Sequence, residues 1–167
     1  YNIEIPRRIT GVTMGTDGNT PTTPITGDPG TVIKGNDLVT NAKQFIGWTR
    51  EQMAQLMDSS GSWCAKFVSY IFSITSGANM PTSYTAVDSW ASYFQSKNSY
   101  YHSNYWASCT KNPSYCNKYP GISTAGGPKV GDIIIFSQNN CKYDGSGTLP
   151  DKVEGECYRH IGIVTGV

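Results

Sequence analysis

The sequence has no excess of charge of either sign and no long apolar run. Its 13 Lys and Arg residues balance 12 Asp and Glu residues, so the composition offers no basic face that would neutralise nucleic-acid phosphates. The longest strongly apolar run, residues 133–136, is far shorter than the roughly 20 residues of a membrane-spanning helix. We therefore expect no nucleic-acid partner and no membrane span.

Metal-binding patterns are missing as well. The chain has 2 histidines, and its cysteine spacing does not match the usual zinc sites. Four acidic residues near the C-terminus lack the regular spacing of calcium ligands, namely Asp144, Asp151, Glu154 and Glu156. No glycine-rich phosphate-binding loop is present. We therefore expect neither a metal ion nor another cofactor.

Five cysteines are present, and four of them lie in stretches rich in Tyr, Asn, Ser, Gly and Lys, which are loop compositions. The simplest pairing joins Cys109 to Cys116 and Cys141 to Cys157. A disulfide that closes a loop of about 15 residues stabilises a fold by about 3 kcal/mol in the entropic interpretation. Such disulfides indicate an oxidising compartment, so we expect a secreted, extracellular protein. Cys64 stays unpaired.

The first 31 residues differ from the rest of the chain. They are dense in Thr, Pro and Gly and contain few apolar residues after Met14, which is typical of a linker or an extended arm. Such an arm can follow the domain surface or connect to an upstream module or assembly. Residues 32–167 then form one domain, which agrees with the usual domain size of about 100 to 150 residues.

Two short helices are predicted at the start of this domain. Asn36 or Asp37 can cap a helix that ends at Gly47. Thr49 and Gln52 have the capping-box spacing that begins a second helix. The apolar face predicted for the first helix comprises Leu38, Ala42, Phe45 and Ile46.

A third helix has the strongest pattern, because apolar residues recur from Cys64 at the i, i+3, i+4, i+7 and i+8 positions. Ser62 stands where an N-cap belongs, and Gly77 stands where the helix should stop. A fourth helix is expected over 86–94. Two β-branched strands, over 128–136 and 160–167, should pair antiparallel. Helices first and strands last predict an α+β fold with N-terminal helices packed on a small antiparallel sheet.

Cys64 falls in the first turn of the third predicted helix. Unpaired backbone N–H groups and the helix dipole stabilise an anion there. A thiolate is the nucleophilic form of cysteine, and the same amides can hold the oxyanion that forms when it attacks a carbonyl. This placement predicts a catalytic nucleophile. The alternative interpretation is a small buried apolar residue.

A nucleophilic cysteine needs a base, and two histidines are available. His160 begins the last predicted strand, where one side chain can enter a cleft from a rigid element. His102 lies in a polar aromatic loop and is interpreted as an exposed loop residue. We therefore predict that Cys64 and His160 form the catalytic pair.

Candidate substrate contacts are aromatic. Trp63 precedes the nucleophile and should form a wall of the cleft. Tyr105 and Trp106 lie in the tyrosine-rich stretch 97–119, where rings beside small polar residues suit sugar or peptide recognition. The alternative is an irregular loop whose rings cover the core.

Three segments in this order, GSWCAKFVSYIF, PKVGDIIIF and RHIGIVTGV, resemble the CHAP domain of bacterial and phage cell-wall hydrolases. This family belongs to the NlpC/P60 group of papain-like cysteine peptidases, and the resemblance covers about residues 36–167. It implies a papain-like fold, with Cys64 as nucleophile and His160 as base. It also implies a partner, peptidoglycan or another cell-wall glycopeptide. The implied reaction is amide hydrolysis through an acyl-thioenzyme, by an N-acetylmuramoyl-L-alanine amidase or an endopeptidase.

One feature of the family is not found. Its members usually place a third polar residue on the strand after the histidine, where it orients the imidazole. The sequence ends at Val167, before such a strand, so either C-terminal strands of the domain are missing, or another group substitutes, or the site is degenerate. Glu154 and Glu156 lie near His160 in the sequence and could substitute, but they flank the predicted disulfide loop and are interpreted as solvated. The alternative function is a catalytically degenerate CHAP-like structural or binding module of an extracellular assembly. Acyl transfer to an amine would use the same two residues.

Overall fold

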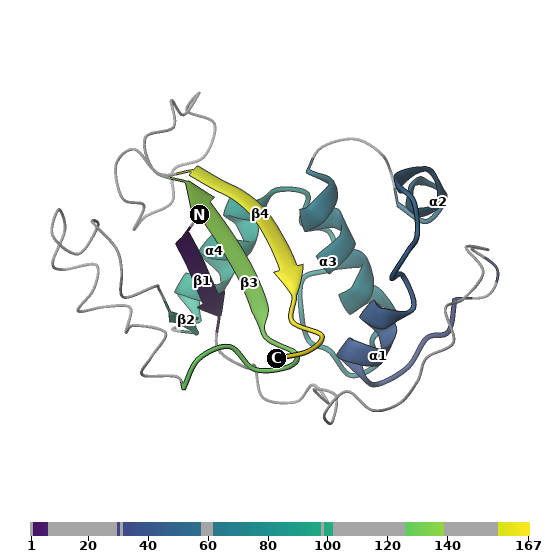
Figure 1. Ribbon diagram of the computed structural model, residues 1–167, viewed down its shortest axis with the longest axis horizontal. Helices are drawn as coiled ribbons and strands as arrows, with labels where there is room; N and C mark the ends of the chain where they lie inside the picture. Colours follow the sequence, from purple (N-terminus) through teal and green to yellow (C-terminus); the bar gives the residue numbers. More distant parts are fainter. Residues whose placement is uncertain are drawn as a thin grey trace, which may run out of the picture.

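The computed structural model describes residues 2–6, 30, 32–57, 62–97, 99–101, 126–138 and 157–167, and gives the backbone alone for residues 2–6, 137, 138 and 157. The described residues form four helices and four strands (Figure 1). Their mixture of helices with an antiparallel sheet confirms the predicted α+β class.

The sheet has the strand order β2-β1-β3-β4, with every neighbouring pair antiparallel. Its strands are β1 (Asn2–Pro6), β2 (Tyr100–Tyr101), β3 (Ile133–Gln138) and β4 (Cys157–Ile163). β3 and β4 correspond to the two predicted strands and pair as predicted. Their β-branched isoleucines favour the extended backbone and pack against one another across the sheet.

Strand β1 lies within the stretch that composition marks as an arm. Ile3 pairs with Phe136 of β3, and Ile5 pairs with Tyr101 of β2, so the N-terminal segment is an interior strand of the sheet. The expected boundary at residue 31 therefore does not separate these residues from the domain. The rest of that stretch, apart from Gly30, lies outside the described residues.

Helix α1 spans Leu38–Lys43, and its N-cap Asp37 accepts a hydrogen bond from Thr40 N at 2.6 Å. The predicted apolar face is correct for its first three members, Leu38, Ala42 and Phe45, which are buried. Ile46 is 62% exposed. The prediction for Ile46 is wrong because the helix ends three residues earlier and the turn that follows rotates this side chain outward.

Helix α2 spans Arg50–Ala54 and begins with the predicted capping box. Thr49 Oγ1 accepts from Gln52 N at 3.3 Å, and Gln52 Oε1 accepts from Thr49 N at 2.7 Å. Such reciprocal bonds satisfy two amides that a helix start leaves without intrahelical partners. Met53 anchors this short helix to the core.

Helix α3 spans Trp63–Ile74 and α4 spans Val87–Ser96, close to their predicted ranges. Trp90 of α4 is fully buried and donates from Nε1 to Ala65 O at 3.2 Å. Its ring also contacts Phe72, with centroids 5.5 Å apart. The two helices are therefore joined by both packing and a buried hydrogen bond.

Figure 1 shows α4 lying behind the sheet and α3 beside β4, and both helices contact β4. The core fills the space between them and includes Val68, Ile71, Trp90, Phe94, Ile135 and Ile161. Within the described residues, no helix has the length and apolar character needed to cross a membrane.

The C-terminal end of α3 is held by a buried asparagine. Asn41 Nδ2 donates to Gly35 O at 3.1 Å, to Ile74 O at 3.3 Å and to Thr75 Oγ1 at 3.0 Å. Because the side chain is 1% exposed, these bonds compensate the cost of burying its amide. They fix the end of α3 against the segment that leads into α1.

A tight turn precedes β3. Gly131 adopts a φ of 89°, a conformation that favours glycine because it has no Cβ. Its amide donates to Val164 O at 2.8 Å, and Val164 N donates to Asp132 O at 2.8 Å. These two backbone bonds tie the start of β3 to the residue after β4. Asp132 Oδ2 accepts from Lys129 N at 2.7 Å, which gives this carboxylate a structural role in the turn.

Candidate functional site

Cys64 is the second residue of α3 and a free, half-buried thiol that packs against the edge of the core. Ser62 occupies the N-cap position, but its side chain makes no capping hydrogen bond. Its Oγ instead lies 3.2 Å from Cys64 Sγ. The hydroxyl therefore contacts the Cys64 side chain and does not cap a backbone amide of α3.

Among the described residues, the first amides of α3 have no side-chain cap. The first intrahelical bond runs from Lys66 N to Ser62 O at 3.1 Å, so the preceding amides of Trp63, Cys64 and Ala65 lie before the regular pattern. An N-cap side chain normally accepts from one of them, and Ser62 does not. Amides in this position can bind an anion or an oxyanion.

Trp63 precedes Cys64 in α3 and is partly buried against the core. Its ring stacks on Phe67 with centroids 6.5 Å apart and planes inclined by 13°. Its buried indole N–H has no hydrogen-bond partner among the described residues. Burying such a donor without a hydrogen-bond partner is unfavourable.

His160 is an exposed residue of β4 and pairs with Phe136 of β3. The two rings face each other with centroids 5.9 Å apart. The neighbouring pair, Ile135 and Ile161, is buried in the core. Because side chains alternate across a strand, His160 lies on the face of the sheet opposite the buried isoleucines.

The structure brings together the two elements that carry the predicted pair, since α3 contacts β4. In the part of the chain that is described, however, no hydrogen bond joins Cys64 to His160, and the sulfur instead contacts Ser62. A β-bulge between Phe136 and Ser137 leaves Arg159 as an extra residue beside His160. Bulges of this kind re-aim neighbouring side chains.

The remaining predicted site residues lie in segments that the structure does not describe. For Cys157 the backbone is described and the side chain is not, so neither predicted disulfide is observable. The other residues concerned are His102, Tyr105, Trp106, Cys109, Cys116, Cys141, Asp144, Asp151, Glu154 and Glu156. Within the described ranges, no three His, Cys, Asp or Glu side chains group as metal ligands would.

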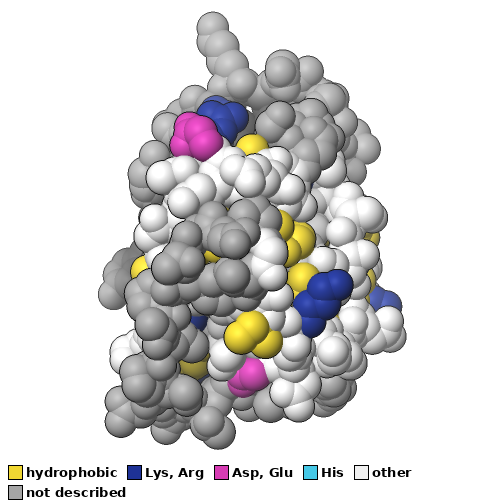
Figure 2. Space-filling model, turned by 90° about the vertical axis from the view of Figure 1, so that its right-hand side faces the viewer, with side chains coloured by type: hydrophobic (Ala, Val, Ile, Leu, Met, Phe, Trp, Pro, Cys, Tyr) yellow, Lys and Arg dark blue, Asp and Glu magenta, His cyan; other side chains and the backbone are white. Residues whose placement is uncertain are grey.

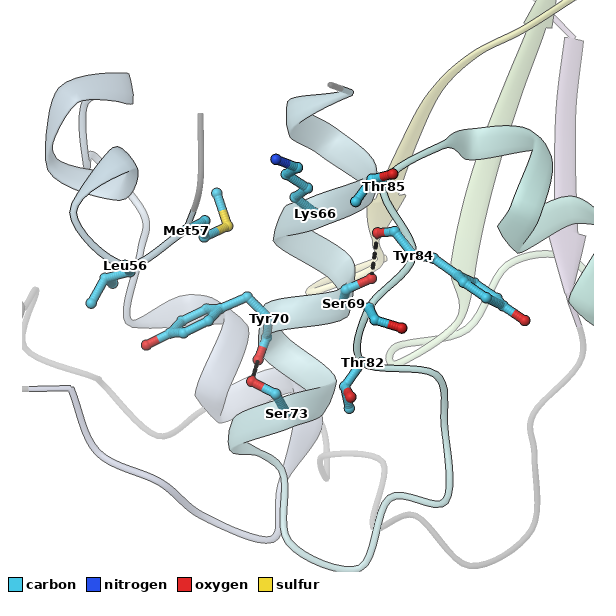
Figure 3. A pocket seen from close by; sticks show the side chains of 10 residues that line it. Leu56, Met57, Lys66, Ser69, Tyr70, Ser73, Thr82, Tyr84 and Thr85 are labelled. Atoms are coloured by element: carbon cyan, nitrogen blue, oxygen red, sulfur yellow. Dashed lines mark hydrogen bonds between the residues drawn. The ribbon is translucent and has the colours of Figure 1, made fainter. Parts of the chain in front are cut away.

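A groove of about 240 Å³ lies on another face of α3 (Figure 3). Lys66, Ser69, Tyr70 and Ser73 form one wall, at the spacing of a single helical face. Lys66 is two positions from Cys64, which is about 200° around the helix, so the thiol and the groove lie on opposite sides of α3.

The sequence contains one pattern that relates to this groove, although we used only the apolar positions of α3 to predict the helix. Polar residues of α3 recur at i, i+3, i+4 and i+7 from Lys66, between the apolar positions that predict the core face. A polar stripe alone ordinarily indicates a solvated helix face. The other walls of the groove come from the end of α2 and from residues 82–85. No sequence pattern predicts that these two segments lie beside α3.

Tyr70 lies at the edge of the groove, where partial burial raises the pKa of its phenol above the ordinary value of 10.0. Desolvation disfavours the phenolate. The same ring packs edge-on against Phe45 with centroids 5.8 Å apart. Tyr70 is therefore a neutral side chain that is fixed in place on one side.

Neither the protein-family models, nor the curated proteins, nor the solved structures contain a significant match to this chain.

Proposed function

We propose that this protein is a cysteine amidase or endopeptidase that hydrolyses an amide of peptidoglycan. The observation that supports this proposal best is the free, half-buried thiol of Cys64 in the first turn of α3, where the N-cap Ser62 makes no side-chain capping bond. The substrate class follows from the resemblance of the three sequence segments to CHAP domains.

In this mechanism the thiolate of Cys64 attacks the carbonyl carbon, and the amides of the first turn of α3 hold the oxyanion. The Ser62 hydroxyl, 3.2 Å from the sulfur, can donate to the thiolate. His160 removes the thiol proton and later returns a proton to the leaving amine. Water then hydrolyses the thioester and releases the carboxylic acid.

The proposed role of His160 requires its ring to approach the sulfur to hydrogen-bond distance. In the structure this ring rests against Phe136 and is exposed. This observation favours a second candidate, a CHAP-like structural or binding module that has lost turnover. The two candidates differ in whether Cys64 is needed to hydrolyse amide bonds of the cell wall.

Clearing of a suspension of purified cell walls, with the released amines quantified, distinguishes them. We expect C64A and H160A to abolish clearing and H102A to retain it. S96A is the matched surface control, because Ser96 is an exposed residue of α4 far along the chain from either proposed catalytic residue. Iodoacetamide should label Cys64 rapidly near neutral pH.

Unchanged release of amines by C64A would refute the enzymatic proposal for this thiol. Binding of the wall by wild type and C64A without any release of amines would establish the module instead. Loss of activity in H102A with retention in H160A would assign the role of base to His102.

A further inference from the structure

We propose that Ser69 is a positioning residue for the thiol of Cys64. It acts through the backbone of residues 84–85 and through Ser62, whose hydroxyl contacts the sulfur. This inference rests on the proposed function of Cys64. It extends that function to a residue of α3 that lies about two helical turns beyond the N-cap.

The first link is the contact between Ser62 and the thiol. Ser62 Oγ lies 3.2 Å from Cys64 Sγ, and a hydroxyl at this distance can donate to a thiolate. The backbone of Ser62 is extended rather than helical. The bond from Lys66 N fixes its carbonyl, but its amide precedes the intrahelical hydrogen bonds. The position of its hydroxyl therefore also depends on what holds this amide.

The second link holds the Ser62 amide. This amide donates to Thr85 O at 3.1 Å. Because an N-cap amide has no partner within its own helix, a bond to a neighbouring segment gives it a defined place. The carbonyl of Thr85 thus helps to determine where Ser62 presents its hydroxyl to the sulfur.

The third link is Ser69 itself. Its side chain is 3% exposed and donates from Oγ to Tyr84 O at 2.7 Å (Figure 3). The Tyr84 ring meets the fully buried Trp90 edge-on, with centroids 5.3 Å apart. The carbonyl of Tyr84 belongs to the planar peptide unit that joins this residue to Thr85. Holding this carbonyl therefore also limits the movement of Thr85.

Removal of the Ser69 hydroxyl should be felt at the sulfur. The Tyr84 carbonyl would lose its donor, and because buried carbonyls are nearly always paired, its peptide unit should rotate toward another donor. Thr85 O would then leave the Ser62 amide, and the Ser62 hydroxyl would no longer be held beside the sulfur. A thiolate that loses a donor is less favoured, and the thiolate is the reactive form of cysteine.

The test is the rate at which iodoacetamide alkylates Cys64 in the full chain near neutral pH, followed by mass spectrometry of the peptide that contains this residue. We expect S62A and S69A each to slow alkylation about fivefold, because each removes the donor to the thiolate. The double variant S62A/S69A should be no slower than S62A, since Ser69 acts through Ser62.

S73A is the matched control. Ser73 also lies on α3 and also donates from Oγ at 2.7 Å, but it donates to Tyr70 O within the same helix. S73A should therefore react like wild type. S69T keeps a hydroxyl at the position of Ser69 and should react faster than S69A.

Charge does not change in any of these variants, because serine, threonine and alanine are all neutral. Figure 2 views the molecule from the side where α2 lies, and hydrophobic patches alternate there with uncharged polar atoms and isolated charged side chains. The variants leave these charges in place, so a change in the reactivity of the thiol reports the loss of a hydroxyl rather than a change in the field of the protein.

Hydrogen exchange on the wild-type protein provides a measurement that does not depend on any variant. We expect the Ser62 amide to exchange at least about fivefold more slowly than in a free peptide, because its bond to Thr85 O must open first. Exchange at the free-peptide rate would overturn the proposal even if S69A did not fold.

An unchanged rate of alkylation in S62A or S69A, a further loss in the double variant, an equal loss in S73A, or S69T as slow as S69A would each overturn the proposal as well. These measurements report the thiol and the backbone and not hydrolysis. Release of amines by C64A would therefore refute the enzymatic proposal separately, and the positioning role of Ser69 would still be decided by the alkylation rates.

Discussion

Ser62 stands at the N-cap of α3 but does not cap it. Most serines at this position accept from a backbone amide two or three residues ahead, whereas the Ser62 hydroxyl contacts Cys64 Sγ. A helix start without its capping bond is less stable by about 1 kcal/mol. The Ser62 hydroxyl contacts the Cys64 thiol instead, and this contact is the reason why we propose a function for this turn.

Tyr70 supplies a prediction at the residue scale. Burial raises the pKa of its phenol above 10.0, so the folded protein holds the phenolic proton more tightly than the unfolded chain does. The stability from this difference is fully present below pH 10.0 and is lost as pH rises through the folded pKa. Y70F cannot ionise, so its stability should fall less than that of wild type above pH 10.0.

Denaturant unfolding at a series of alkaline pH values measures this difference. Phenylalanine keeps the ring contact with Phe45, so the comparison isolates the hydroxyl. Parallel stability curves for wild type and Y70F across the alkaline range would contradict the assigned shift.

At the scale of the element, α2 is a five-residue helix that depends on its first turn. We expect T49A to lower the free energy of unfolding by about 1 kcal/mol, because it removes the acceptor for the Gln52 amide. Thermal unfolding measures the loss. T40A provides a control of the same chemistry on α1, where Thr40 Oγ1 has no capping role, and an effect as large as that of T49A would argue against the capping explanation.

The sequence predicts a helix correctly where residues close together in the chain determine it. The capping box of α2 and the apolar stripe of α3 both depend on residues within two turns of one another, and both predictions are confirmed. Ile46 shows the limit, because periodicity continued past Lys43 while the helix ended there. The end of α1 depends on Gln44, which binds the backbone of Ile33 through its side chain.

At the scale of the whole molecule, β1 could not be predicted from its neighbours in the chain. Ile3 pairs with Phe136, more than a hundred positions away, and composition around it indicates an arm. The position of Cys64 in the first turn of α3 could be predicted, because the apolar pattern of the sequence locates the start of this helix. The relation of Cys64 to His160 was not, because it depends on sheet register and on a bulge that no local pattern encodes.

The interior place of β1 gives a prediction at this scale. Deletion of residues 1–6 would expose the backbone groups of β2 and β3 that pair with it. We expect a loss on the order of 3 kcal/mol, at about 1 kcal/mol for each backbone hydrogen bond. Hydrogen exchange should show faster exchange at β3 amides.

Deletion of Tyr1 alone provides the control, since that residue precedes β1. An unchanged melting temperature after deletion of residues 1–6 would show that this strand does not contribute to the sheet in solution. An equal loss from both deletions would instead point to an effect of the new terminus.

The two ends of α3 are held by different groups. Asn41 bonds to Ile74 O and Thr75 Oγ1 and so clamps the last turn with its side chain. Ser62 holds the first turn through its backbone, since its amide donates to Thr85 O at 3.1 Å while its side chain makes no capping bond. In the proposed hydrolysis, the Ser62 hydroxyl can therefore follow the sulfur as its charge changes, without the loss of a helix-capping bond.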